Sequence, residues 1–439
     1  MGHERLVIAG WLEQWFESSK SPYPHVYPSE NHDEPKGVPA RIRKALGLVL
    51  EGILLVLSNT GHQRKSSLGE DNMLRRTIQA ALFVVAVAAM TVPFSCQNAS
   101  SAGTSERART YNLYFGDLHT HTGYSDAYED STPWDAYEAA IAAGADFMAV
   151  TDHIAIWHDY EAWISTPEEW HDCLAAADHY TSRKFVAMAG YEAWLLGNVG
   201  EINVYNTREL PSWQLGYRQD RLPSFYDWLA QQPGAIGQFN HPLYVSDNFM
   251  DFAYYTPSRD SGMNIIEVYN DEFTEESYVM ALDAGWHLMP SANSDTHYSD
   301  WIAGHEMRTV LLAESLTSEN LYAAMSACRG YATLDKDLQV YYTLNGAVMG
   351  SVLSPASKYE VSVKISDPDG AVDAIRLVEI VSDGGEVVAS MDFDSEKVQW
   401  TTTLTSNSAQ YFYVRVTTAS DLWGVEGVTA WTAPVWTGR

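Results

Sequence analysis

Seven short strand-like segments recur through the middle of this chain, and helical patterns separate most of them. The segments are residues 111–118, 147–151, 185–191, 201–205, 235–240, 264–269 and 287–294. Between the first two, Trp134, Tyr137, Ala140 and Ile141 recur at helical spacing within residues 133–143. Strands that alternate with helices predict a parallel sheet or a barrel. The sequence therefore predicts an α/β fold.

Most of these segments end in a residue type that binds metal ions. The first leads into His119 and His121, which face the same side of a strand because successive side chains alternate. The later residues of this kind are Asp152, His153, Glu192, His241, Asp295 and His297, and Asp126 follows the first histidine pair. In β/α barrels the working residues lie at the C-terminal ends of the strands. Imidazoles and carboxylates gathered there predict a divalent metal site.

Each of these residues also has an ordinary structural explanation. A histidine at a strand end can cap a neighbouring carbonyl, and an aspartate before a turn is common turn chemistry. The recurrence of ligand-type residues at successive strand ends favours the metal interpretation.

The residues around the strand ends form a series of motifs. They are Asp117-Leu118-His119-Thr120-His121 with Tyr124-Ser125-Asp126, Thr151-Asp152-His153, Gly190-Tyr191-Glu192, Asn240-His241-Pro242 and Asn293-Ser294-Asp295-Thr296-His297. In order and spacing they resemble the PHP (polymerase and histidinol phosphatase) family, over residues 111–335. The resemblance is closest to the branch that includes carbaryl hydrolases, to which Arg329-Gly330-Tyr331-Ala332-Thr333 is also similar. It implies a distorted seven-stranded β/α barrel.

The resemblance also implies two or three divalent metal ions, which would be zinc, manganese or iron. By position, the first ion would be held by His119, His121, Glu192 and Asp295. Glu192 would bridge to a second ion, shared with His241, and the third would be held by Asp126, His153 and His297. Glu192 and Asp295 would be the catalytic residues.

One position departs from the family pattern. The strand after the bridging glutamate usually carries a histidine, and Gly200-Glu201-Ile202-Asn203 places Glu201 there instead. A carboxylate can still bind the second metal, and its harder oxygen favours manganese or iron over zinc. Alternatively, Glu201 faces solvent, and His241 and Glu192 hold that metal alone.

The expected activity is hydrolysis by a metal-activated hydroxide that attacks a phosphorus or carbonyl centre. A phosphoesterase acting on a small anionic ester is favoured by the resemblance. A carbamate or ester hydrolase of the carbaryl-hydrolase type is the alternative, and a non-catalytic surface binding lipoprotein is a further one. Clustered carboxylates and histidines would destabilise the fold if no metal were bound to them. The complete set of ligand-type residues therefore argues against the non-catalytic binding protein.

The chain is strongly acidic, with a net charge of −30 over 439 residues. The first 76 residues are almost neutral, with 10 basic and 9 acidic side chains, so the acidity belongs to the remainder. Such a surface repels phosphate backbones and argues against a nucleic-acid partner. Nothing in the sequence indicates an oligomeric state.

The N-terminal region resembles a targeting segment. Arg75 and Arg76 precede an apolar run that ends at Cys96, so residues 73–96 are expected to be a signal peptide. Cys96 resembles a lipoprotein cleavage site, and a cleaved secretory signal or an uncleaved anchor is the alternative. We expect export to the periplasm or cell surface, with membrane contact only through this lipid or anchor. Residues 1–72 would be an upstream extension and 97–110 a linker.

The pattern changes after residue 338. Alternating strands separated by turn residues predict an antiparallel β-sandwich over residues 338–439, distinct from the barrel of residues 111–335. The strands are expected at residues 339–344, 359–365, 374–381, 386–391, 398–404 and 411–417. Trp400, Trp423, Trp431 and Trp436 are either core or a carbohydrate-binding face. Cys173 and Cys328 are expected to be reduced and buried.

Overall fold

All seven predicted strand segments of the first half form strands. The computed structural model describes residues 111–155, 165–194, 200–211, 221–242, 248–270, 272–369, 373–406, 408–419 and 427–438. All of them belong to one compact unit, Glu106–Arg439. The expected extension, signal segment, linker and Cys96 lie outside the described residues.

The strands of the first half pair in the order in which they occur in the sequence. They are β1 (Asn112–Asp117), β2 (Phe147–Val150), β4 (Val186–Trp194), β5 (Glu201–Tyr205), β6 (Ile236–Asn240), β7 (Met263–Asn270) and β9 (Met289–Ala292). A parallel bridge between Thr120 and Thr296 joins the segments that follow β1 and β9. The α/β class is confirmed, but β5 runs antiparallel to both neighbours, whereas the sequence predicted parallel pairing.

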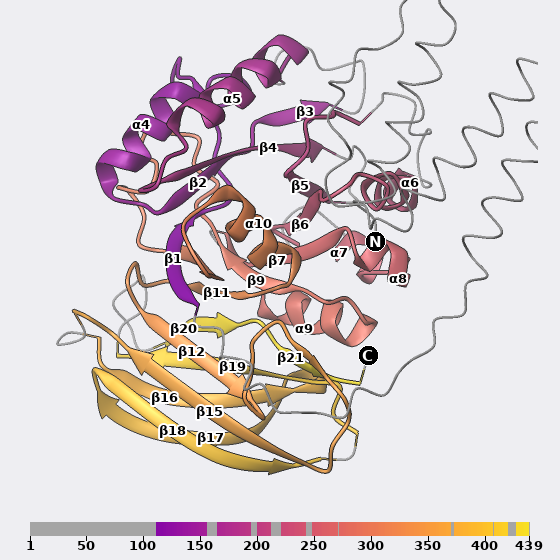
Figure 1. Cartoon of the computed structure of the whole chain (residues 1–439), viewed down its shortest axis with the longest axis vertical. Helices are drawn as coiled ribbons and strands as arrows, with labels where there is room; N and C mark the ends of the chain where they lie inside the picture. Colours follow the sequence, from indigo (N-terminus) through magenta and orange to yellow (C-terminus); the bar gives the residue numbers. More distant parts are fainter. Residues whose placement is uncertain are drawn as a thin grey trace, which may run out of the picture. The chain divides into compact units, whose positions relative to one another are not determined.

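The remaining elements of the first half surround these strands. The short strands are β3 (His153–Ala155), β8 (Glu272–Phe273), β10 (Arg308–Ala313) and β11 (Gly330–Thr333). The helices are α4 (Pro133–Ala143), α5 (Pro167–Tyr180), α6 (Arg221–Leu229), α7 (Asn248–Asp251), α8 (Pro257–Asp260), α9 (Glu275–Ala284) and α10 (Ser318–Ser326). Figure 1 shows α4 and α5 together, and α4 contacts β2 while α5 contacts β4.

Local sequence explains where the helices begin and end. Thr132 and Asp135 form a capping box at the start of α4, with Pro133 in the first turn. The helix ends at Gly144, whose φ of 85° is left-handed and costs a glycine little. Its buried face includes Tyr137 and Ala140 as expected, whereas Ile141 is exposed.

The second half of the chain forms two further groups of strands. One sheet has the order β13 (Ala347–Val348), β12 (Gln339–Leu344), β15 (Lys358–Ser366) and β18 (Lys397–Thr405). The other group contains β17 (Glu386–Ser395), β16 (Ile375–Ser382), β19 (Tyr411–Thr418), β20 (Gly427–Thr432), β21 (Val435–Thr437) and β14 (Val352–Leu353), with the short 3-10 turn Asp383–Gly385 before β17. Buried and exposed residues alternate along β15, so one of its faces packs inward.

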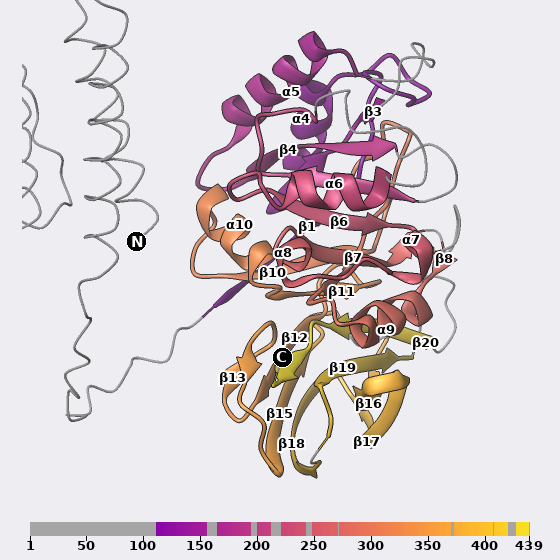
Figure 2. The same ribbon diagram turned by 90° about the vertical axis from the view of Figure 1, so that its right-hand side faces the viewer.

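The two halves share a continuous run of paired strands. β20 pairs antiparallel with β11, which pairs in turn with β10 and through it with β1. Figure 1 and Figure 2 show β11 and β20 between the helices of the first half and the C-terminal strands. Trp400, Trp431 and Trp436 are buried, which supports their role as core residues, whereas Trp423 lies outside the described residues.

Two further findings concern the cysteines and the helices. Cys173 and Cys328 are free and buried, as predicted. Within the part of the chain that the structure describes, no helix has the length and apolar character needed to cross a membrane.

Candidate metal centre

The structure brings the nine predicted metal-ligating side chains together into three overlapping groups. Each group has ligand atoms that lie within 4.8 Å of one another. Most of these residues lie at or just beyond the C-terminal end of a strand, whereas Glu192 lies inside β4, Glu201 begins β5 and Asp126 lies in the loop that follows β1. Asp117 helps to align these ends, since its carboxylate accepts hydrogen bonds from the backbone N–H groups of His119 (3.0 Å) and Ser294 (3.1 Å).

The first group contains His119, His121, Glu192 and Asp295, the set expected for the first ion. The Nε2 atoms of the two histidines lie 3.2 Å apart. Asp295 Oδ1 lies 3.2 Å from His119 Nε2 and 2.9 Å from His121 Nε2. Both histidines and Glu192 are buried, and Asp295 is partly exposed.

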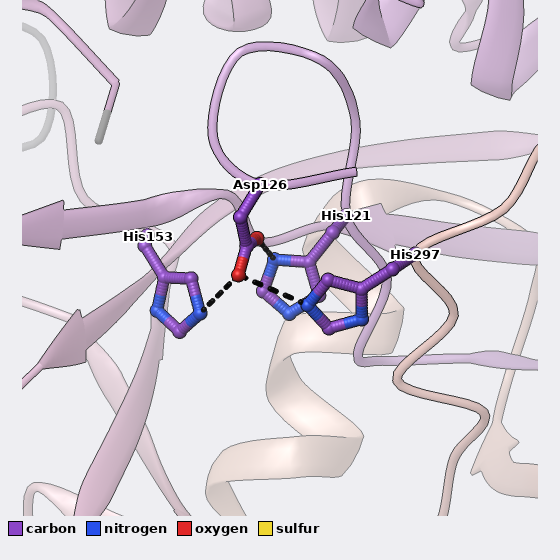
Figure 3. A group of neighbouring side chains, drawn as sticks. All are labelled: His121, Asp126, His153 and His297. Carbon is purple, nitrogen blue, oxygen red and sulfur yellow. Dashed lines mark ion pairs between the residues drawn. The ribbon is translucent and has the colours of Figure 1, made fainter. Parts of the chain in front are cut away.

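The second group gathers around Asp126 and contains one more residue than expected. Asp126 Oδ2 lies 3.2 Å from His297 Nε2 and 3.5 Å from His153 Nε2 (Figure 3). His121 joins this group through its other ring nitrogen, since Nδ1 lies 3.7 Å from Asp126 Oδ1. One imidazole therefore faces two ligand groups.

The third group contains Glu192, Glu201 and His241. His241 Nε2 lies 3.2 Å from Glu201 Oε2 and 3.3 Å from Glu192 Oε1. The β5–β6 register pairs Glu201 with Asn240, which places the glutamate next to His241. Glu201 therefore faces the other ligands; the solvent-facing alternative does not describe its position.

Glu192 connects all of these groups through its two carboxylate oxygens. Oε2 faces three imidazoles, those of His119 (3.1 Å), His121 (3.3 Å) and His153 (3.3 Å). Oε1 faces His241 and accepts a hydrogen bond of 2.6 Å from Asn240 Nδ2. This is the arrangement that a carboxylate needs to bridge two cations.

Electrostatics within the cluster are dominated by burial and by the alternation of acids and imidazoles. Burial opposes the charged form of His121, but Asp295 and Glu192 outweigh it and raise its pKa to about 9. Burial likewise opposes ionisation of Glu192 and Asp295, and the histidines around them hold the pKa of each well below its usual range. The carboxylates thus stay ionised at neutral pH and attract positive charge, either as protons on histidine or as bound cations.

Several features of the residues fit divalent metal ions. Asp295 Oδ1 is a buried atom that accepts no hydrogen bond, although two imidazole Nε2 atoms lie within 3.2 Å of it. Imidazoles and carboxylates without thiolates are donors that suit zinc, manganese and iron. Asp295 and His241 also adopt left-handed φ values of 48° and 27°, a conformation that costs roughly 1–3 kcal/mol and is typical of functional sites.

The sequence did not indicate Glu267, which orients the first histidine. This fully buried β7 residue accepts a hydrogen bond of 2.9 Å from His119 Nδ1, in the tautomer that leaves His119 Nε2 free to bind a metal. It also accepts hydrogen bonds from Asn293 Nδ2 (2.8 Å) and the His241 N–H (2.8 Å). The available signal was a single carboxylate among the apolar residues Ile265, Ile266, Val268 and Tyr269 of β7.

Two exposed tyrosines lie beside the group around Asp126. Tyr298 follows His297 in the chain, and its ring stacks on that of Tyr128 with centroids 4.8 Å apart. The backbone N–H of Tyr128 donates to the carbonyl of His297. The most accessible ligands, Asp126 and His297, therefore border an aromatic surface.

The comparisons with known proteins include a weak structural similarity. The sequence matches no family model and no curated protein. A solved two-domain protein from Bacteroides vulgatus, which contains a predicted PHP-like metal-dependent phosphoesterase, is 16% identical in sequence, with 74% of this chain and 96% of that chain covered. The TM-score of this match is 0.40.

Proposed function

We propose that this protein is a metal-dependent hydrolase that cleaves small anionic esters, most of all phosphoesters. The observation that carries the proposal is the position of Glu192, whose two oxygens face different ligand groups. A carboxylate shared in this way holds two cations close together. Divalent ions bound there would acidify a water nucleophile and neutralise the negative charge that develops on an attacked ester.

Other residues of the chain orient the ligands or lie where substrate would enter. Glu267 fixes the tautomer and ring orientation of His119, and Asn240 fixes one oxygen of Glu192. Asp126 and His297 have side chains that are 21% and 27% exposed, in contrast to the buried His119, His121 and Glu192. We propose that substrate reaches the centre from this side, past Tyr128 and Tyr298.

Charge favours an anionic substrate once the metals are bound. Without cations the cluster contains five carboxylates, those of Asp126, Glu192, Glu201, Glu267 and Asp295, whose negative charge is offset only by protons on the neighbouring histidines. Several divalent ions would add more positive charge than those protons, so the same site would then attract anionic oxygens. A carbamate or carboxylic ester fits the same chemistry and is the second candidate.

The proposal extends to family, fold and location. We propose a PHP-like centre of the carbaryl-hydrolase type in a distorted β/α barrel that is followed by a β-sandwich. Export by the segment 73–96, with or without a lipid on Cys96, is part of the same proposal. A non-catalytic surface binding protein remains the competing function.

A substrate panel tests the proposal. The full chain, purified without chelator, is assayed with manganese, zinc and iron against aryl phosphate monoesters, aryl phosphate diesters and aryl carbamates. We expect hydrolysis of at least one phosphoester, its loss on chelation and its return with added metal. Metal binding without hydrolysis of any substrate in the panel would favour the binding protein, and less than about one metal per chain would contradict both.

A further inference from the structure

A second group of carboxylates lies outside the proposed hydrolytic centre, where the chain enters and leaves the β12–β15 ladder. Asp335 and Asp337 lie between β11 and β12, and Asp367 and Asp369 lie just after β15. The register that pairs Gln339 with Ser366 brings the two turns together. Each aspartate offers one oxygen, and these oxygens lie within 4.8 Å of one another.

The most buried member of this group has an oxygen without a hydrogen-bond donor. Asp367 is only 1% exposed, and its Oδ1 accepts the Asp369 N–H at 3.2 Å, while its Oδ2 is buried and accepts nothing. Asp335 repeats this pattern, since Oδ1 accepts two backbone N–H groups and the buried Oδ2 accepts none. Asp337 Oδ1 and Asp373 Oδ1 are also buried without a donor. Such groups are destabilising unless a cation compensates them.

The nearby lysine does not provide this compensation. Lys336 Nζ lies 3.7 Å from Asp369 Oδ2, but it lies closer to Glu306, at 3.1 Å, and its side chain is 48% exposed. It therefore contacts the most exposed aspartate of the group and leaves the buried oxygens of Asp335 and Asp367 unpaired.

We infer that Asp335, Asp337, Asp367 and Asp369 bind a Ca²⁺ ion. Every ligand is an oxygen, which Ca²⁺ prefers, whereas zinc favours nitrogen and sulfur donors. Ca²⁺–oxygen distances are about 2.3–2.6 Å, so ligands on opposite sides of one ion lie about 5 Å apart, in agreement with the spacing in this group. The hydrogen bonds to the Oδ1 atoms hold each Oδ2 in a fixed direction, as outer partners of metal ligands do.

The pKa values of the buried aspartates agree with this inference. Burial and neighbouring carboxylates raise the pKa of Asp335 to about 6 and that of Asp367 to about 7. Without a cation, mutual repulsion therefore opposes the folded arrangement. A bound Ca²⁺ ion would remove this repulsion and join the β11–β12 turn to the β15–β16 turn.

Calcium binding to the full chain tests the inference. The proposed hydrolytic centre is first saturated with zinc, and ⁴⁵Ca²⁺ uptake is then measured by equilibrium dialysis at free Ca²⁺ of about 1 mM or below. We expect one Ca²⁺ per chain, and at least a tenfold loss of affinity in Asp367→Asn and in the half-buried Asp337→Asn. Asp392→Asn, at an exposed aspartate of β17, is the matched control and should bind like the wild type.

Thermal unfolding separates a cation site from an ordinary structural aspartate. In chelator, Asp367→Asn should unfold at a higher temperature than the wild type, because the substitution removes repulsion and keeps the oxygen that accepts the Asp369 N–H. In Ca²⁺ the order should reverse, with the wild type gaining at least about 2 °C. The inference would be wrong if Asp367→Asn unfolded at a lower temperature than the wild type in both conditions. It would also be wrong if the wild type took up no Ca²⁺. Loss of hydrolysis in Glu192→Gln with Ca²⁺ binding intact would show that the two sites are independent.

Discussion

At the scale of single residues, Glu192 is the side chain that the ligand groups share. Its two oxygens face four imidazoles within 3.3 Å, so removal of its charge affects more than one group at once. The residue is buried and its hydrogen bond from Asn240 does not require a charge. Its substitution by glutamine therefore tests the bridging role with little change in packing.

Glu192→Gln should lower kcat at least 100-fold, which corresponds to about 2.7 kcal/mol of activation free energy. The amide keeps the shape of the side chain and removes one of the two anionic oxygens needed to bind two cations. Steady-state kinetics and metal content per chain provide the measurement, with exposed Glu209→Gln as the control. Turnover near the wild-type value would reject the bridging role.

Glu201 tests the departure from the family pattern. Glu201→Ala should lower the metal content and the activity, because its Oε2 lies beside His241 in the third group. Glu201→His should retain activity and shift metal preference from manganese towards zinc. If the Glu201 carboxylate does not bind metal, metal titrations of the wild type, Glu201→Ala and Glu201→His would be identical.

Glu267 tests whether the orientation of His119 matters. Glu267→Gln retains an oxygen that can accept the His119 N–H but removes the charge, and metal affinity should fall about 10–100-fold. Competition with a metal chelator of known affinity measures this change. Unfolding in urea serves as the control, because an equal affinity together with a lower stability would assign Glu267 a packing role only.

At the scale of elements, strand ends were the most predictable part of the molecule. Residue type and position indicated eight of the nine side chains, because the ends of adjacent strands meet at one edge of a sheet, and Glu201 was selected only through the family resemblance. The direction of β5 was not predictable, because the residues of Glu201–Tyr205 suit a parallel strand as well as an antiparallel one. Glu267 was missed because it lies inside a strand, and Asp335 and Asp367 because aspartates in turns are common.

Helix α9 and strand β19 are joined by a charged contact that sequence spacing could not predict. Arg415 Nη1 lies 3.0 Å from Glu275 Oε1 on α9, and its Nε lies 2.8 Å from Glu379 Oε2 on β16. Tyr413 also donates a hydrogen bond of 2.7 Å to Glu275. Figure 2 shows α9 close to β19 and β20.

Arg415→Met should lower the free energy of unfolding by about 1–3 kcal/mol, because it leaves two partly buried glutamates without their partner. Urea unfolding measures the loss. Arg376→Met is the matched control, since Arg376 pairs with the exposed Asp394 on a neighbouring part of the sheet and should change stability by about 0.5 kcal/mol or less. Equal losses in the two variants would show that the contact between α9 and β19 contributes nothing particular.

At the scale of the whole molecule, the metal centre makes stability depend on pH and on metal together. In metal-free protein the folded-state pKa of His121, about 9, lies above its ordinary value of 6.5. Its protonation therefore stabilises the fold fully below pH 6.5, and this contribution is lost as the pH rises through 9. The pKa values of His119, His153, His241 and His297 are raised too, so their contributions have the same sign.

The melting temperature of chelator-treated protein should consequently fall between pH 6.5 and pH 9. Metal-loaded protein should show a much smaller change, because its histidines bind the ions in their neutral form. Differential scanning calorimetry across this range, with and without chelator, makes the comparison. If the melting temperature changed with pH to the same extent with and without chelator, protonation of these histidines would not compete with metal binding.

The pairing of β20 with β11 has a consequence for how the protein is made. β11 is synthesised before β20, so one edge of β11 lacks its neighbour until β20 has left the ribosome. An unpaired strand edge readily accepts a strand from another chain. Nascent or truncated chains that lack β20 should therefore self-associate or recruit chaperones, although their strand-end ligands have already been synthesised.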